Sequence, residues 1–175
     1  VQTGSFGACL MAEPALVAAC VGAMRGAAAV PVTVKHRIGL DAGEDYGFVR
    51  DFVGIVAAGG CEVFIVHARN AVLKGLSPKE NREVPPLRYE VVHRLKRDFP
   101  ALTIVLNGGL GDWDGIEREL AHVDGVMLGR VAYHDPYFLA QAGWRAFADD
   151  TPARSRAEVL QALLPYARTQ LARGV

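Results

Sequence analysis

Four short apolar runs, rich in β-branched residues, alternate with helix-like segments, and this alternation limits the possible folds more than any other feature. The runs are "VPVTVKHR", "EVFIVH", "LTIVLNGG" and "VDGVMLGR". Strands that alternate with helices in this way predict a parallel sheet joined by right-handed crossovers. The sequence therefore predicts an α/β fold in which the strands are buried.

The segments between these runs carry helical signals. Pro14 opens the first segment, and glycines or prolines close several of the others. The predicted helices cover residues 13–26, 45–58, 88–99, 112–122, 136–147 and 156–173. Cys20 is expected to be a buried thiol of the first helix, and Cys61 to be structural. The second helix is expected to pack through Phe48, Phe52, Ile55 and Val56.

Every predicted strand ends in polar, basic or glycine-rich residues, namely "KHR", "HAR", "NGG" and "GR". Parallel α/β sheets bind their ligands at the carboxyl ends of the strands, and in a (β/α)8 barrel this is the catalytic face. Four βα units would form half of such a barrel. An open Rossmann-like sheet is the alternative, although no GxGxxG pattern follows a strand.

The last two strand ends match the phosphate-binding turns that follow strands seven and eight of barrels. Backbone N–H groups at Gly108, Gly109, Gly129 and Arg130 can approach phosphate oxygens, because three of these residues lack a Cβ atom. The sequence therefore predicts that these two turns bind a phosphate group.

Titratable side chains stand at the ends of the first two strands. Lys35 is predicted to be a fixed cation beside an anionic ligand, with a snorkelling surface lysine as the alternative. His67 is predicted to donate a hydrogen bond to a ligand or to transfer a proton, with a structural histidine as the alternative. His36 should point to the other side of its strand, where it either supports a residue of the site or is structural.

Charge is distributed unevenly along the chain. The formal net charge is 0, but residues 69–97 contain eight Lys or Arg against three Asp or Glu. This segment predicts a basic patch that can meet phosphate groups, with an ordinary solvated helix face as the alternative. Within it, the connection 68–87 is longer than a routine linker and mixes cations with turn residues, which favours a functional loop.

Several classes of function lack support in the sequence. No apolar run is long enough for a membrane span, so we expect no membrane partner. No HExxH motif or Cys/His cluster suggests a metal, and no GxSxG motif suggests a hydrolase nucleophile. The three cysteines lack CxxC spacing and fit a reduced, cytoplasmic setting.

Seven stretches of the chain together resemble one known family: "GSFGACLM", "PVTVKHRIGLD", "FIVHAR", "GLSPKENREVPPL", "LKRDFP", "NGG" and "DGVMLGR". The family is that of the tRNA-dihydrouridine synthases, specifically the A-type bacterial enzymes, and the resemblance covers nearly the whole chain. It implies an FMN-bearing (β/α)8 TIM barrel followed by a helical domain. It also implies NADPH-dependent reduction of uridine to 5,6-dihydrouridine in the D-loop of tRNA, at position 20 or 20a.

The resemblance assigns roles to individual residues. Lys35 and His67 would contact the FMN. A second group would hold the ribityl phosphate end of the flavin: Asn107, Gly108, Gly109, Gly129 and Arg130. Lys79 and Arg82 would touch the tRNA and help to define which uridine is reached.

The sequence departs from the family at one catalytic position. The family's proton donor is a cysteine in a "GCPS" turn, which we expect just upstream of Val1, so we expect no catalytic residue in this chain and no activity from it alone. On this interpretation residues 1–148 are the FMN-binding half of a barrel, and residues 149–175 begin a helical tRNA-binding domain. The alternatives are a small-molecule flavin barrel oxidoreductase and a non-catalytic fragment.

Overall fold

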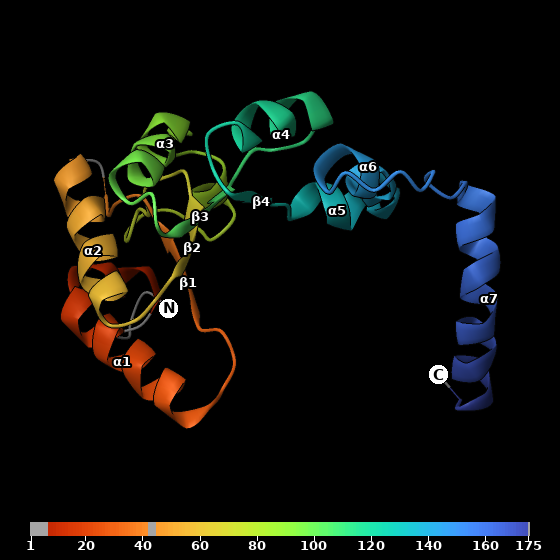
Figure 1. The fold of residues 1–175 in the computed structure, drawn as a ribbon, viewed down its shortest axis with the longest axis horizontal. Coiled ribbons are helices and arrows are strands. Elements are labelled where there is room, and N and C mark those ends of the chain that lie inside the picture. Colours follow the sequence, from red (N-terminus) through yellow and green to blue (C-terminus); the bar gives the residue numbers. More distant parts are fainter. Residues whose placement is uncertain (1–6, 42–44, 175) are drawn as a thin grey trace. The chain divides into compact units, whose positions relative to one another are not determined.

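The computed structural model describes residues 7–41 and 45–174 of the chain. It divides into two compact units, Val1–Leu128 and Gly129–Val175. The first unit contains a sheet and the helices that accompany it, and the second is built from helices and their connections (Figure 1).

Four parallel strands form the sheet, and they lie side by side in the order in which they occur in the chain. They are β1 (Thr33–Arg37), β2 (Val63–His67), β3 (Thr103–Asn107) and β4 (Gly125–Met127). This arrangement confirms the predicted α/β fold with a parallel sheet. The completion of such a sheet into a TIM barrel stays a prediction.

The strands alternate between buried and more exposed residues, which differs from the prediction that they are buried throughout. Every second residue of β2 and β3 is fully buried: Phe64, Val66, Ile104 and Leu106. Thr33 and Lys35 of β1 are exposed, whereas His36, which follows Lys35, is buried. Successive side chains of a strand point to opposite faces of the sheet. In the described residues, therefore, one face of the sheet is packed and the other is more open.

Helices and their apolar side chains account for the packed face. They are α1 (Pro14–Ala27), α2 (Tyr46–Ala58), α3 (Tyr89–Asp98) and α4 (Trp113–Leu120), preceded by the 3-10 helix η1 (Gly7–Ala12). Figure 1 shows α1 beside α2, and α2 and α3 beside the strands. The Asp45 and Asp112 carboxylates cap α2 and α4 by accepting hydrogen bonds from backbone N–H groups. These caps confirm the predicted starts of both helices.

Two side chains of these helices differ from their predicted burial. Cys20 is exposed rather than buried, and Ile55 is 43% exposed. The buried residue of α1 is Val21, and those of α2 are Val49, Phe52, Val53 and Val56. Each residue turns by about 100° around a helix, so the neighbour of a buried position can face solvent. Cys61, by contrast, is fully buried and fits its predicted structural role.

The second unit contains more breaks than the sequence predicts. Instead of one helix over residues 136–147, it has a 3-10 helix and a short α-helix, preceded by a helix that the sequence pattern missed. Its elements are α5 (Arg130–His134), η3 (Pro136–Gln141), α6 (Ala142–Ala146) and α7 (Arg156–Ala172). The Arg156 guanidinium lies 4.2 Å from the centre of the Tyr137 ring, and the Tyr137 hydroxyl donates to the Arg154 carbonyl at 2.7 Å. These contacts tie the start of α7 to η3.

Gly59, which ends α2, lies directly against α1. A Cβ atom on Gly59 would stand 2.8 Å from the Ala18 Cβ and 2.8 Å from the Ala18 carbonyl oxygen. We expect Gly59→Ala to lower the free energy of unfolding by about 1–3 kcal/mol, because the two helices must move apart. Chemical denaturation measures the change. Gly26→Ala is the control: a Cβ there meets nothing within 4 Å, and alanine favours a helix by about 0.5–1 kcal/mol over glycine. Equal effects of the two substitutions would contradict the close packing.

Asp124 joins three segments of the first unit. Its Oδ2 atom accepts a hydrogen bond from the Ile104 N–H at 2.8 Å and lies 2.8 Å from the Lys96 Nζ atom. The Lys96 ammonium also donates to the carbonyls of Pro100 and Leu102. Burial alone would raise the pKa of Asp124. The hydrogen bonds that its carboxylate accepts from Lys96 and from the Ile104 N–H outweigh this effect and lower the pKa below its usual value.

We expect Asp124→Asn to destabilise the protein by about 1–3 kcal/mol at pH 7. The pKa of Asp124 is lower in the folded than in the unfolded state, so ionisation of Asp124 stabilises the fold at a pH above the unfolded-state pKa. This stabilisation is lost as the pH falls through the folded-state pKa. Denaturation from pH 7 down to about pH 2 should therefore show the difference between wild type and variant shrinking below about pH 4. The exposed Asp150→Asn serves as the control. A difference that stays constant with pH would refute the assignment.

Candidate functional site

The register of the sheet places three of the predicted site residues on one face of the sheet. Arg37, His67, Asn107 and Met127 form a row across the carboxyl ends of the strands. Lys35 lies two residues before Arg37, and side chains two apart on a strand share a face. Lys35, His67 and Asn107 therefore belong to the same, more open face, as the predicted ligand site requires.

Lys35 is exposed, but enough protein surrounds its ammonium group to affect its protonation. Partial burial and the nearby positive charge of Arg37 lower the pKa of Lys35 below its ordinary value. A cation in such surroundings gains from a negative group beside it. The site therefore favours an anionic ligand at this position.

His67 lies at the end of β2 under the glycine turn that follows β3. It is 8% exposed, although it belongs to the more open face. A Cβ atom on Gly108 would stand 2.7 Å from the His67 Cδ2 atom, and one on Gly109 would collide with Leu87. Both glycines have positive φ angles, 116° and 71°, which other residues rarely adopt. The turn can follow this path close to the imidazole only as glycine.

Two hydrogen bonds fix the turn. The Tyr89 hydroxyl donates to the Gly108 carbonyl at 2.6 Å, so α3 holds the turn from outside. The Asn107 side-chain amide donates to the Met127 carbonyl at 2.8 Å and joins β3 to β4. Gly129 and Arg130, the other predicted phosphate ligands, are exposed residues that begin the second unit. Their role at a phosphate group stays a prediction.

His36 points away from Lys35 and is 7% exposed, packed against the rings of Phe52 and Phe64. Its Nδ1 atom lies 2.6 Å from the Arg37 carbonyl oxygen, which can only accept, so Nδ1 carries the proton. Burial lowers the pKa of His36 to about 4, against a smaller opposing effect of this hydrogen bond. His36 is thus neutral at pH 7 and structural, as predicted.

Two arginines at the strand ends, which the sequence analysis did not assign, hold the connection 68–87. Arg37 donates through Nη1 to the carbonyls of Asn70 at 3.2 Å and Asn81 at 2.9 Å. Arg69 donates through Nη1 to the carbonyls of Glu83 and Pro85. Both arginines stand in the quoted motifs "KHR" and "HAR", so their position at the strand ends was the available signal.

The two predicted tRNA contacts lie in the same connection. Arg82 ends the 3-10 helix η2 (Glu80–Arg82), and Lys79 immediately precedes it. Both side chains are exposed. Burial lowers the pKa of Arg37, and the charges of Arg69 and Arg82 lower it further. The connection thus gathers positive charge next to the ends of β1 and β2.

A hollow of about 460 Å³ adjoins β1 on the side of the packed helices. Its walls include Lys35, His36 and Arg37, together with Met11 of η1 and Phe52 of α2. It therefore touches the predicted site at Lys35, but its remaining lining is largely apolar.

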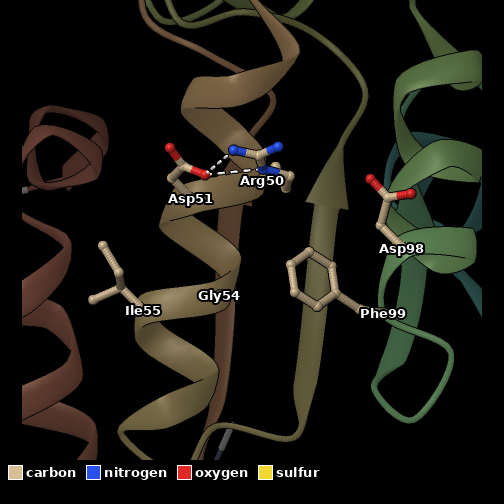
Figure 2. A pocket seen from close by; sticks show the side chains of 6 residues that line it. All are labelled: Arg50, Asp51, Gly54, Ile55, Asp98 and Phe99. Carbon is tan, nitrogen blue, oxygen red and sulfur yellow. Dashed lines mark hydrogen bonds and ion pairs between the residues drawn. The ribbon is translucent and has the colours of Figure 1, made fainter.

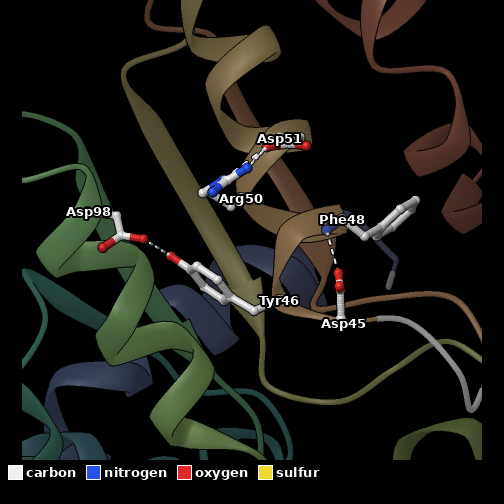
Figure 3. Close-up of polar contacts among 6 residues, drawn as sticks. All are labelled: Asp45, Tyr46, Phe48, Arg50, Asp51 and Asp98. Carbon is white, nitrogen blue, oxygen red and sulfur yellow. Dashed lines mark hydrogen bonds and ion pairs between the residues drawn. The ribbon is translucent and has the colours of Figure 1, made fainter.

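A separate groove of about 580 Å³ lies between α2 and α3 (Figure 2). Its lining residues are Arg50, Asp51, Gly54, Ile55, Asp98 and Phe99. Beside it the Tyr46 hydroxyl donates to the Asp98 Oδ2 atom at 2.6 Å (Figure 3). Burial raises the pKa of Tyr46, and the bond to Asp98 raises it further. This groove shares no residue with the predicted site, and its polar groups are occupied with one another.

Within residues 7–41 and 45–174, no three His, Cys, Asp or Glu side chains are grouped so that they could hold a metal ion. Over the same residues, no helix combines the length and the apolar character that crossing a membrane requires.

Comparison with known proteins gives a consistent result over the whole chain. The family model described as "Dihydrouridine synthase (Dus)" matches residues 1–175. The tRNA-dihydrouridine(20/20a) synthase of Pseudomonas putida is 58% identical over 166 residues, which are 95% of this chain and 49% of that protein. The enzyme of the same name from Xanthomonas campestris is 56% identical over 175 residues, 100% of this chain and 52% of that protein. The chain thus spans about half the length of the curated relatives it matches.

One solved structure, nitroalkane oxidase from Streptomyces ansochromogenes, is matched with a TM-score of 0.38 and 16% identity. The match covers 69% of this chain and 41% of that one. A likeness at this level carries no argument about the fold or the site.

The glycine turn gives a direct test of the geometry around His67. We expect Gly108→Ala to lower the free energy of unfolding by about 1–3 kcal/mol, since it adds a strained φ angle and a collision with the imidazole. It should also shift the NMR signals of the His67 ring. Gly111→Ala is the control, because a Cβ atom there meets nothing within 4 Å. Unchanged His67 signals in the Gly108 variant would contradict the contact.

Proposed function

The chain belongs to the dihydrouridine synthase family, and on that premise we propose that it takes part in the reduction of uridine to 5,6-dihydrouridine in tRNA. We propose FMN as the cofactor, NADPH as the reductant and a D-loop uridine, at position 20 or 20a, as the target. The single observation that carries the proposal is the placement of Lys35, His67 and Asn107 on one face of the sheet, in a chain matched by the family model along its whole length.

The chemistry of the site fits FMN. A cation at Lys35 suits an anionic ring edge, the imidazole of His67 can donate a hydrogen bond to a ring carbonyl, and a glycine turn suits a phosphate. A Cβ atom on Gly108 would meet the His67 ring, and one on Gly109 would meet Leu87 and Tyr89, so the turn requires glycine at both positions. Asn107, Gly129 and Arg130 complete the proposed phosphate end.

FMN, when bound, would supply the hydride that is added to the uracil ring. The residues of this chain would prepare that step. Lys35 would hold negative charge beside the ring, and His67, fixed under the glycine turn, would orient it. The proton for the second carbon of uracil would come from the cysteine of the family's "GCPS" turn, a motif that this sequence does not contain.

We further propose that the four strands are half of a TIM barrel, that residues 149–175 begin a helical tRNA-binding domain, and that the enzyme acts in the cytoplasm. Lys79 and Arg82, exposed on the connection 68–87, would contact the phosphate backbone of the tRNA. The names of the relatives support tRNA as the substrate over the small-molecule alternative. A target base in a folded tRNA must leave its stack to reach such a site.

Flavin binding tests the proposal. The purified chain, titrated with FMN, should quench flavin fluorescence, and Lys35→Ala should weaken the affinity about tenfold by removing a charge-assisted contact. The exposed Lys74→Ala, which removes the same charge from the connection 68–87, should bind as wild type does. Because the pKa of Lys35 is lowered, affinity should fall on raising the pH sooner than for an ordinary lysine.

Equal affinities of the Lys35 and Lys74 variants would overturn the assigned flavin contact. The reaction itself is tested by incubating unmodified tRNA with NADPH, FMN and the protein that contains this chain, and by measuring dihydrouridine by mass spectrometry. Reduction of free uridine but not of tRNA would favour the small-molecule alternative.

A further inference from the structure

One neutral side chain, Asn81, organises the connection 68–87. This connection contains little regular structure apart from η2 and a single bridge between Leu40 and Ala71. An exposed segment of this kind stays ordered only if its backbone groups find partners. Asn81 supplies several of these partners.

The Asn81 side chain pairs with the backbone of Val72 through both ends of its amide. Its Oδ1 atom accepts from the Val72 N–H at 2.8 Å, and its Nδ2 atom donates to the Val72 carbonyl at 2.8 Å. The two bonds reproduce the pairing that a neighbouring strand would give. The backbone carbonyl of Asn81 accepts from Arg37 at 2.9 Å, and its N–H donates to Ser77. Asn81 thus joins two parts of the connection 68–87, at Val72 and at Ser77, to Arg37 at the end of β1.

The position of Asn81 matters because it lies between two exposed cations. Lys79 and Arg82 are three residues apart across a 3-10 turn, closed by the bond from the Arg82 N–H to the Lys79 carbonyl. Side chains three apart in a 3-10 helix project from the same side. The turn therefore presents two positive charges together, and Asn81 fixes the backbone that carries them.

The acidic residue within the turn is engaged locally. The Glu80 carboxylate accepts a hydrogen bond from the Ser77 N–H at 2.8 Å, and the Ser77 hydroxyl accepts from the Glu80 N–H at 3.2 Å. Arg37 and Arg69 direct their guanidinium groups to carbonyls of the same connection. Glu80 and Glu83 keep two negative charges beside η2, against the four positive charges of Lys79, Arg82, Arg37 and Arg69. The charge there is thus predominantly positive, which suits phosphate groups.

We propose that Asn81 is a positioning residue, which holds Lys79 and Arg82 in the geometry that meets neighbouring phosphates of the tRNA backbone. This inference rests on the proposed function and adds to it a neutral residue that touches no RNA itself. Asn81 acts through the two cations, so its effect on binding must depend on their presence.

A double-mutant cycle tests this dependence. The affinity of the protein that contains this chain for an unmodified tRNA transcript is measured with Asn81→Ala, with Lys79→Ala/Arg82→Ala, and with all three changes. We expect Asn81→Ala to weaken binding about tenfold in the wild-type background, and by less than about twofold when both cations are absent. The salt dependence of log Kd should also become shallower by about 1 to 2 in both the Asn81 and the cation variants.

Val84→Ala is the control, since it is neutral, lies in the same connection and shortens a side chain that is 62% exposed and cannot form a hydrogen bond. It should leave the affinity within about twofold of wild type. Equal losses from Asn81→Ala in both backgrounds, or no loss in the wild-type background, would overturn the inference alone. If the cation variant binds as wild type does, the proposed RNA contact fails, and this inference with it.

A second readout needs no RNA. Trypsin cleaves after Lys79 and Arg82, and cleavage of an ordered turn requires local opening. We expect Asn81→Ala to accelerate cleavage at these two sites about tenfold while the midpoint of thermal unfolding stays close to that of wild type. A wild-type cleavage rate in this variant would show that Asn81 does not order the turn.

Discussion

The parallel register of the sheet is the constraint on which the candidate site depends. Arg37, His67 and Asn107 pair directly across β1, β2 and β3, so their positions relative to one another are fixed by backbone hydrogen bonds. A slip of one residue in any strand would move its site residue to the face occupied by the helices. The buried residues Phe64 and Ile104 prevent such a slip, because it would expose both. The alternation of buried and more exposed residues along the strands therefore determines both the core and the site.

The strand ends also organise the surface beyond them. Arg37 and Arg69 reach carbonyls up to 44 residues away in the chain, and Tyr89 holds the glycine turn beside His67. The connection 68–87 and the glycine turn are thus each held by side chains that donate hydrogen bonds to backbone carbonyls.

Much of the fold could be predicted because its signals are local. β-branched runs indicated the four strands, and Asp112 indicated the start of α4. The exposure of Cys20 could not be predicted, because apolar neighbours on both sides conceal which side of α1 is packed. The contacts of Arg37 and Asn81 could not be predicted either. Each joins a side chain to a backbone group distant in sequence or in an irregular turn, and no periodicity records such a contact.

The hydrogen bonds of Lys96 reduce the positive charge that residues 69–97 present to a binding partner. Its ammonium group is shared among Asp124 and two carbonyls, an arrangement that suits three donors spread around one nitrogen better than a planar guanidinium. Arg88 is likewise paired with Glu90. Of the eight cations in residues 69–97, Lys96 is thus paired with Asp124, Arg88 is paired with Glu90, and Arg69 donates to carbonyls of the connection 68–87. The electrostatic attraction that this segment exerts on a polyanion is accordingly weaker than the number of its cations alone suggests.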